Sequence, residues 1–219
     1  MFKKLFASFG ARKALPGASA KPYKTDELNL IYQLLFCDDP DLVKATPVQA
    51  SLFGAAPDAR VVQTIGEDPA EESRVRLLAW HWLRTSGQPI ASREVLGIVV
   101  EVPLEEGLDA LAAYADGSVR YINHTGSVAV FEGSPAEVAE QGKRLVHAAI
   151  PLAVRGAARN RMAPPAVGNV RFSLLTADGL HVREGTFSDI ARDALSGPAL
   201  QEAQRLLDTI VRQGTQPPA

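Results

Sequence analysis

The spacing of apolar residues changes near residue 93, where the three-to-four period of a helix gives way to alternation. Alternation predicts strands that bury one face of a sheet. Asp116-Gly117 and Thr125-Gly126 separate successive segments, and such pairs favour tight hairpin turns because glycine adopts positive φ without strain. The pattern predicts an antiparallel meander of about four strands, at residues 95–102, 108–115, 118–124 and 127–131.

Amphipathic segments with helix-start signals surround this meander. Thr25 is a good N-cap for a helix with an acidic first turn. Residues 68–71 and 134–137 each place a capping side chain, a proline and a glutamate at the spacing of a capping box. A last helix is expected to begin near Pro198, whereas residues 41–66 predict loops with a short helix.

A second pair of alternating segments follows a proline pair at residues 164–165. Residues 170–177 and 180–185 flank Asp178-Gly179 and predict another hairpin, whose place relative to the meander the pattern leaves open. We therefore expect an α+β fold, in which an antiparallel β-meander plus a later hairpin carries helices packed on the sheet. The expected organisation is one globular domain at 23–212, with a candidate sub-boundary near 158–168 and a disordered tail at 213–219.

The first 22 residues predict a basic amphipathic arm and a flexible linker. Four apolar residues lie on one helical stripe and two lysines lie off it: Phe2, Leu5, Phe6, Phe9, Lys3 and Lys4. Six of the 23 basic residues precede the first acidic one, Asp26, which leaves 17 basic residues against all 25 acidic ones. Such an arm suits a membrane surface or a groove on a protein partner, and it also suits docking on the acidic body of its own chain.

Composition narrows the class of protein. Hydrophobic residues make up 46% and charged residues 22% of the chain, which is typical of a globular protein with a core. No run of 18 apolar residues predicts a membrane span. The single cysteine, Cys37, cannot form an internal disulfide, and no secretory signal is evident, so we expect a cytoplasmic protein, peripheral to the membrane if the arm binds lipid. The abundance of alanine and arginine suggests a bacterial source.

Motifs for common chemistries are missing from the sequence. It contains no phosphate-binding loop, no dinucleotide fingerprint and no nucleophile elbow. No two histidines lie three or four residues apart, and Cys37 has no neighbouring cysteine or histidine, so we predict no metal site and no cofactor. The acidic body also argues against nucleic-acid binding, which requires a basic surface.

Arg120 is the most informative charged residue of the meander. Two-residue turns would place Arg120 opposite Ala113 on one neighbouring strand and opposite Phe131 on the other. Both faces of the meander are largely apolar, so we expect Arg120 among apolar neighbours, where an unpaired charge is costly. The guanidinium then needs a ligand, or else carbonyl groups and a salt bridge to a helix acid with packing on the Phe131 ring.

Tyr121, Asn123 and His124 follow Arg120 and complete a candidate ligand-binding site. His124 begins a turn, where a histidine side chain usually meets solvent or backbone groups. Four acids also cluster around one loop of the meander, at Glu101, Glu105, Glu106 and Asp109. Paired acids perform acid–base work or hold cations, although acids in a hairpin loop are most often solvated.

Three interpretations of function remain open. The missing catalytic set and the amphipathic arm favour a non-enzymatic cytoplasmic bacterial protein that acts as a binding or adaptor module. The second interpretation is an enzyme or small-ligand-binding protein with a site on the meander around Arg120 and His124. The third is a structural subunit of a larger assembly.

Overall fold

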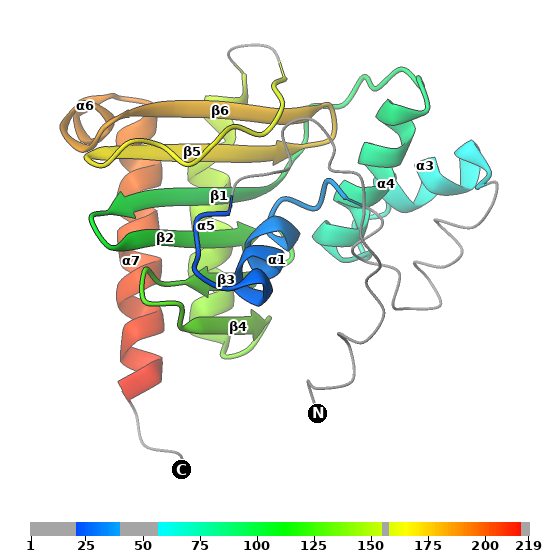
Figure 1. The fold of residues 1–219 in the computed structure, drawn as a ribbon. Helices are drawn as coiled ribbons and strands as arrows, with labels where there is room; N and C mark the ends of the chain where they lie inside the picture. The colour runs from blue at the N-terminus through cyan, green and yellow to red at the C-terminus, as the bar shows by residue number, and fades with distance from the viewer. Residues whose placement is uncertain (1–20, 40–56, 155–157, 216–219) are drawn as a thin grey trace.

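A six-stranded antiparallel sheet forms the centre of the protein, with strands in the order β4-β3-β2-β1-β5-β6 (Figure 1). The computed structural model describes residues 21–39, 57–154 and 158–215. The contacts expected of Phe2, Lys3, Lys4, Leu5, Phe6 and Phe9 lie outside these residues.

The strands confirm the predicted α+β fold. The meander consists of four strands and the later hairpin of two: β1 (Val95–Leu104), β2 (Gly107–Tyr114), β3 (Ser118–Ile122), β4 (Val128–Glu132), β5 (Asn169–Thr176) and β6 (Gly179–Thr186). β5 pairs antiparallel with β1, so the later hairpin extends the sheet of the meander instead of forming a second layer.

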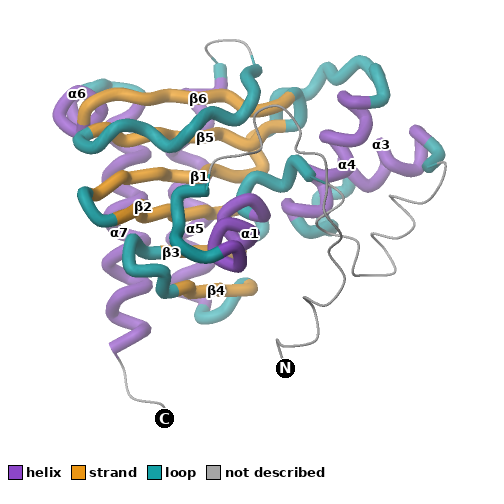
Figure 2. Tube along the Cα trace, viewed as in Figure 1, coloured by secondary structure: helices purple, strands orange, loops and turns teal. Residues whose placement is uncertain are grey.

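Helices cover both faces of the sheet (Figure 2). They are α1 (Asp26–Leu34), α3 (Ala59–Glu67), α4 (Ser73–Thr85), α5 (Ala136–Ala153), α6 (Phe187–Arg192) and α7 (Ser196–Thr215). α5 and α7 pack on one face around Ile98 and Phe172. The segments of α1 and α4 pack on the other face around Leu96 and Tyr114. No described helix combines the length and apolarity needed to cross a bilayer.

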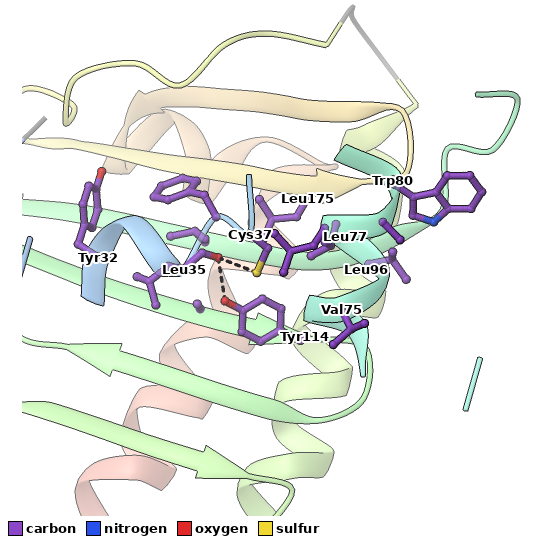
Figure 3. Close-up of a cluster of buried hydrophobic side chains, with 14 of the residues drawn as sticks. Tyr32, Leu35, Cys37, Val75, Leu77, Trp80, Leu96, Tyr114 and Leu175 are labelled. Atoms are coloured by element: carbon purple, nitrogen blue, oxygen red, sulfur yellow. Dashed lines mark hydrogen bonds between the residues drawn. The ribbon is translucent and has the colours of Figure 1, made fainter. Parts of the chain in front are cut away.

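Tyr114 anchors the core on the α1 and α4 face (Figure 3). Its ring is fully buried, and its hydroxyl donates a 2.7 Å hydrogen bond to the carbonyl oxygen of Leu35, just beyond α1. Gly97 on β1 makes room for the ring, since a Cβ atom there would lie 2.8 Å from the Tyr114 Cδ1 atom. Cys37 packs in the same core at a positive φ of 51°, and burial raises the pKa of its thiol.

A capping residue close in sequence sets the start of α1 but not the start of α4. Thr25 caps α1 as predicted, accepting a hydrogen bond from the backbone N–H of Leu28. The capping box at 68–71 is wrong, because Asp68 instead ends α3 and α4 begins at Ser73. The carboxylate of Asp116, in the β2–β3 turn, accepts the Ser73 N–H at 2.8 Å. A hydrogen bond between residues far apart in the sequence, Ser73 and Asp116, thus replaces the predicted local cap.

The register of the meander differs by one residue from the prediction. Tyr114 and Ser118 bracket a three-residue loop whose Gly117 has a φ of 91° and donates its N–H to the Tyr114 carbonyl oxygen. Arg120 therefore lies opposite Ala112 rather than Ala113. Because side chains alternate between faces, this shift moves every side chain of β3 to the face opposite the predicted one relative to β2.

The β3–β4 hairpin has the same kind of loop. Asn123 pairs with Ser127, and Gly126 between them has a φ of 93°. Arg120 lies opposite Val130, not opposite Phe131. In both hairpins the glycine occupies the last position of a three-residue loop, where a left-handed conformation is required.

Candidate functional site at the open sheet edge

Arg120 is held by its own sheet. Its side chain is 8% exposed, and Nη1 donates to the carbonyl oxygens of Val119 at 3.0 Å and Phe131 at 3.1 Å. Nη2 forms an ion pair with Glu132 at the end of β4. These contacts supply the carboxylate and the carbonyl groups that a buried guanidinium needs. The acid comes from the neighbouring strand rather than from a helix.

Tyr121 and His124 meet on the opposite face of the sheet, around Asp109. The Tyr121 hydroxyl donates to Asp109 Oδ2 at 3.0 Å, and the His124 backbone N–H donates to Oδ1 at 2.7 Å. His124 Nδ1 also lies 3.1 Å from Oδ1. Burial and the Asp109 charge raise the pKa of Tyr121 above its usual value. The structure thus brings together two of the predicted site residues and separates them from Arg120.

The Asp109–His124 pair has part of what acid–base chemistry requires. A carboxylate on Nδ1 fixes the imidazole and leaves Nε2 as the reactive nitrogen. Among the described residues, no hydroxyl or thiol is hydrogen-bonded to that nitrogen. Asn123 does not join the pair, since its Oδ1 accepts from the Thr125 hydroxyl and the Ser127 N–H and so braces the turn.

Glu101 belongs to a separate, buried network. It accepts a 2.7 Å hydrogen bond from the Tyr32 hydroxyl of α1 and lies 3.9 Å from Arg171 on β5. Burial raises the pKa of Glu101, and the Tyr32 and Arg171 contacts oppose that rise. Glu105 and Glu106, by contrast, are exposed in the β1–β2 turn. The four acids of the sequence cluster therefore do not form one site.

The outer edge of β4 presents unpaired backbone groups. Asn123 and Ser127 exchange a ladder hydrogen bond, so alternation along the antiparallel ladder turns the N–H and C=O groups of Val128, Val130 and Glu132 away from β3. No described residue is bonded to these groups. The side chains of Val128 and Val130 are 39% and 52% exposed. Sequence reasoning identified this strand but not its position at the edge.

An apolar depression lies beside the same strand on the α7 face. It has a volume of about 320 Å³. Its lining comes from β3, from β4 and the residue before it, and from the last turns of α7: Tyr121, Ser127, Val128, Ala129, Phe131, Ile210, Val211 and Gln213. Figure 1 shows that α7 continues past β4, beyond the edge of the sheet. The end of the helix therefore forms a ledge that projects past the open edge.

This edge has the features of a docking site for an extended chain. Its outward backbone groups are bonded to no described residue, and apolar surface flanks them on both faces of the sheet. Among the described residues, no three His, Cys, Asp or Glu side chains are grouped closely enough to hold a metal ion. Comparison of the chain with protein-family models, curated proteins and solved structures finds no match.

Proposed function

We propose that this protein is a non-enzymatic binding module that takes up an extended segment of a partner as a further strand beside β4. The observation that carries the proposal is the row of outward backbone groups on Val128, Val130 and Glu132. An unpaired strand edge is a template for another strand. Backbone hydrogen bonds then supply affinity, and pockets for alternate side chains supply specificity.

The surroundings of β4 favour a partner segment of β-branched residues such as valine and threonine, whose methyl groups suit apolar surface on both faces. Side chains on one face of the added strand would enter the depression beside Phe131 and Val211. Those on the other face would pack on Val128 and Val130. The α7 ledge extends under the position of the added strand, which would lie about 4.8 Å beyond β4.

A synthetic heptapeptide of alternating valine and threonine between terminal lysines tests the proposal. In a ¹⁵N-labelled sample, the peptide should shift the amide resonances of Val128, Val130 and Glu132 and slow their hydrogen exchange. Val130→Pro removes one outward donor without touching the ladder to β3, and it should weaken binding about tenfold. The peptide with proline in place of each threonine is the control and should not bind.

Two results would overturn the proposal. One is the absence of shifts at β4 with the peptide in large excess. The other is a set of shifts centred on Asp109 and His124, which would favour a ligand site at that pair instead.

A further inference from the structure

We infer that the strand received at this edge is β4 of a second copy of the chain, so that two sheets join around a twofold axis at Val130. The inference rests on the proposed function, because it names the occupant of the same edge. It makes the protein a symmetric dimer with one continuous antiparallel sheet, whose interface is formed by identical patches.

The backbone of β4 selects one register for this pairing. With Val130 opposite its own equivalent, Val128 faces Glu132, and every outward N–H meets an outward C=O. A slip of one residue would set outward groups against groups that already bond β3. A slip of two residues would leave the outward groups at each end of the strand unpaired. The centred register is thus the one that satisfies the whole edge.

The side chains of β4 are complementary in the same register. On the α7 face, Ala129 of each copy lies opposite Phe131 of the other, at the pairs where side chains approach most closely. A small residue therefore faces a large one, beside the apolar depression. On the other face Glu132 lies opposite Val128 and stays paired with Arg120 of its own chain, so no like charges face each other.

The α7 ledge completes the interface. A twofold axis perpendicular to the sheet keeps both α7 helices on the same face, so each overhanging end lies against the strand of the other copy. Val211, which is 55% exposed near the end of α7 and lines the depression beside β4, then becomes covered. A five-residue strand and one helix end form a contact smaller than the roughly 800 Å² per partner of a standard interface. We therefore expect a dissociation constant of about 1–100 µM.

Sedimentation velocity of the purified full chain over that concentration range tests the dimer. The wild type should shift from monomer to dimer as its concentration rises. Val130→Lys places a charge at the centre of the contact and should weaken dimerisation more than tenfold. Val61→Lys on α3 is the matched control, because Val61 is 56% exposed and Val130 is 52% exposed, and it should dimerise like the wild type.

A crosslink tests the register independently of stability. In the centred pairing the two Val130 Cα atoms lie about 5.5 Å apart, within the range of a disulfide. Val130→Cys should therefore form a disulfide-linked dimer under mild oxidation, whereas Val61→Cys should not. The native Cys37 is buried and does not compete.

The outcomes separate this inference from the proposed function. A chain that stays monomeric, or a dimer that Val130→Lys leaves intact, overturns the inference. If the heptapeptide still shifts the β4 amides of a monomeric chain, the binding module stands and its occupant is another protein. If neither dimer nor peptide complex forms, both proposals fail.

Discussion

The β6 edge of the sheet meets another part of the same chain, whereas the outward groups of β4 meet no described residue. The Arg159 N–H donates to the Leu180 carbonyl oxygen of β6 at 2.7 Å. β6 also carries Arg183 and Glu184, and charges on an edge strand discourage pairing with another chain. No described segment bridges β4, which contains no lysine or proline, and its one charged residue, Glu132, is paired with Arg120. The contrast indicates that one edge is protected and the other is available.

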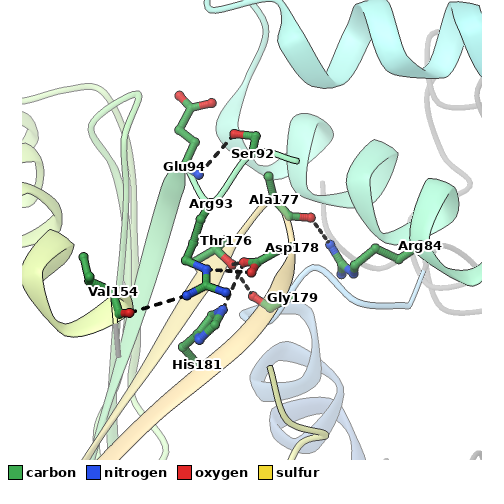
Figure 4. Close-up of polar contacts among 10 residues, drawn as sticks. All are labelled: Arg84, Ser92, Arg93, Glu94, Val154, Thr176, Ala177, Asp178, Gly179 and His181. Atoms are coloured by element: carbon green, nitrogen blue, oxygen red, sulfur yellow. Dashed lines mark hydrogen bonds and ion pairs between the residues drawn. The ribbon is translucent and has the colours of Figure 1, made fainter. Parts of the chain in front are cut away.

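The turn between β5 and β6 is tied down on several sides (Figure 4). Asp178 accepts a 2.8 Å hydrogen bond from Arg93 Nε and lies 3.0 Å from His181 Nε2. Arg84 of α4 donates to the Ala177 carbonyl oxygen at 2.6 Å. We call this half of the sheet the closed end, and the β3–β4 half the open end. The side-chain contacts of the closed end thus fix the β5–β6 turn to α4 and to the segment before β1.

The largest expected effect compares two buried arginines of the sheet, Arg171 at the closed end and Arg120 at the open end. Arg171 is 5% exposed, pairs with Glu184 at 2.8 Å and lies near the buried Glu101. Arg171→Met strands Glu101 without its positive charge, so we expect a loss of about 3–5 kcal/mol in the free energy of unfolding. Arg120→Met should cost about 1–2 kcal/mol, because Glu132 is 65% exposed and regains water.

Urea unfolding followed by circular dichroism measures both losses. The double variant Arg171→Met with Glu101→Gln is the control, since it removes the stranded charge and should recover part of the stability. Equal losses for Arg171→Met and Arg120→Met would contradict the view that the closed end holds the more tightly coupled charges.

A smaller expected effect is the loss of folding stability at low pH. Burial, assisted by Arg84, lowers the pKa of His81 on α4 to about 4, with Arg161 acting in the same direction and Asp39 against it. The folded state therefore binds fewer protons than the unfolded chain between pH 4 and 6.5, and stability falls as the pH drops through that window. We expect a loss of about 1–3 kcal/mol by pH 4, since the ring is only partly buried.

His81→Gln removes this proton uptake, so its stability should fall less than that of the wild type between pH 7 and pH 4.5. Urea midpoints at the two pH values measure the difference. An equal fall in the urea midpoint for the two proteins would show that other groups dominate the loss of stability in acid.

The strands and their order along the chain were predictable because alternation and glycine turns are local signals. The register was not, since nothing local shows that Ala115 and His124 add a third residue to each loop. The burial of Arg120 followed from its apolar neighbours, but its acid partner depended on that register. The cap on α4 could not be predicted either, because the Asp116 carboxylate reaches it from a distant turn.

The edge position of β4 also lay beyond the sequence. Val128 to Phe131 form a continuous apolar run, and a strand in the middle of a sheet would have the same pattern. What exposes β4 is the pairing of β5 with β1, which extends the sheet in the other direction. The local sequence pattern of a strand does not predict which distant strand will pair with it. Asp109, placed among the loop acids by the sequence, became a partner of Tyr121 and His124 because β2 pairs with β3.

The smallest expected effect compares two glycines, one at each edge. Gly179 starts β6 with a φ of 136°, and a Cβ atom there would lie 2.8 Å from the Ala158 Cβ atom. Gly133 follows β4 with a φ of 77° and has nothing within 4 Å of such an atom. Alanine at either position strains the backbone by about 1–2 kcal/mol, but Gly179→Ala also pushes against the segment that bridges β6. We expect Gly179→Ala to cost about 1 kcal/mol more.

Ala158→Gly provides the decisive comparison for this pair. It removes the atom that Gly179→Ala would meet, so the double variant should be more stable than the sum of the single losses predicts, by about 0.5–1 kcal/mol. Combined with Gly133→Ala, the same change should be additive, because the two sites share no contact. Thermal unfolding of the three single and two double variants beside the wild type measures both coupling energies. Additivity at Gly179 would show that the segment around Ala158 does not press on the β6 edge, and the protected edge would then depend on its charges and its single bridge alone.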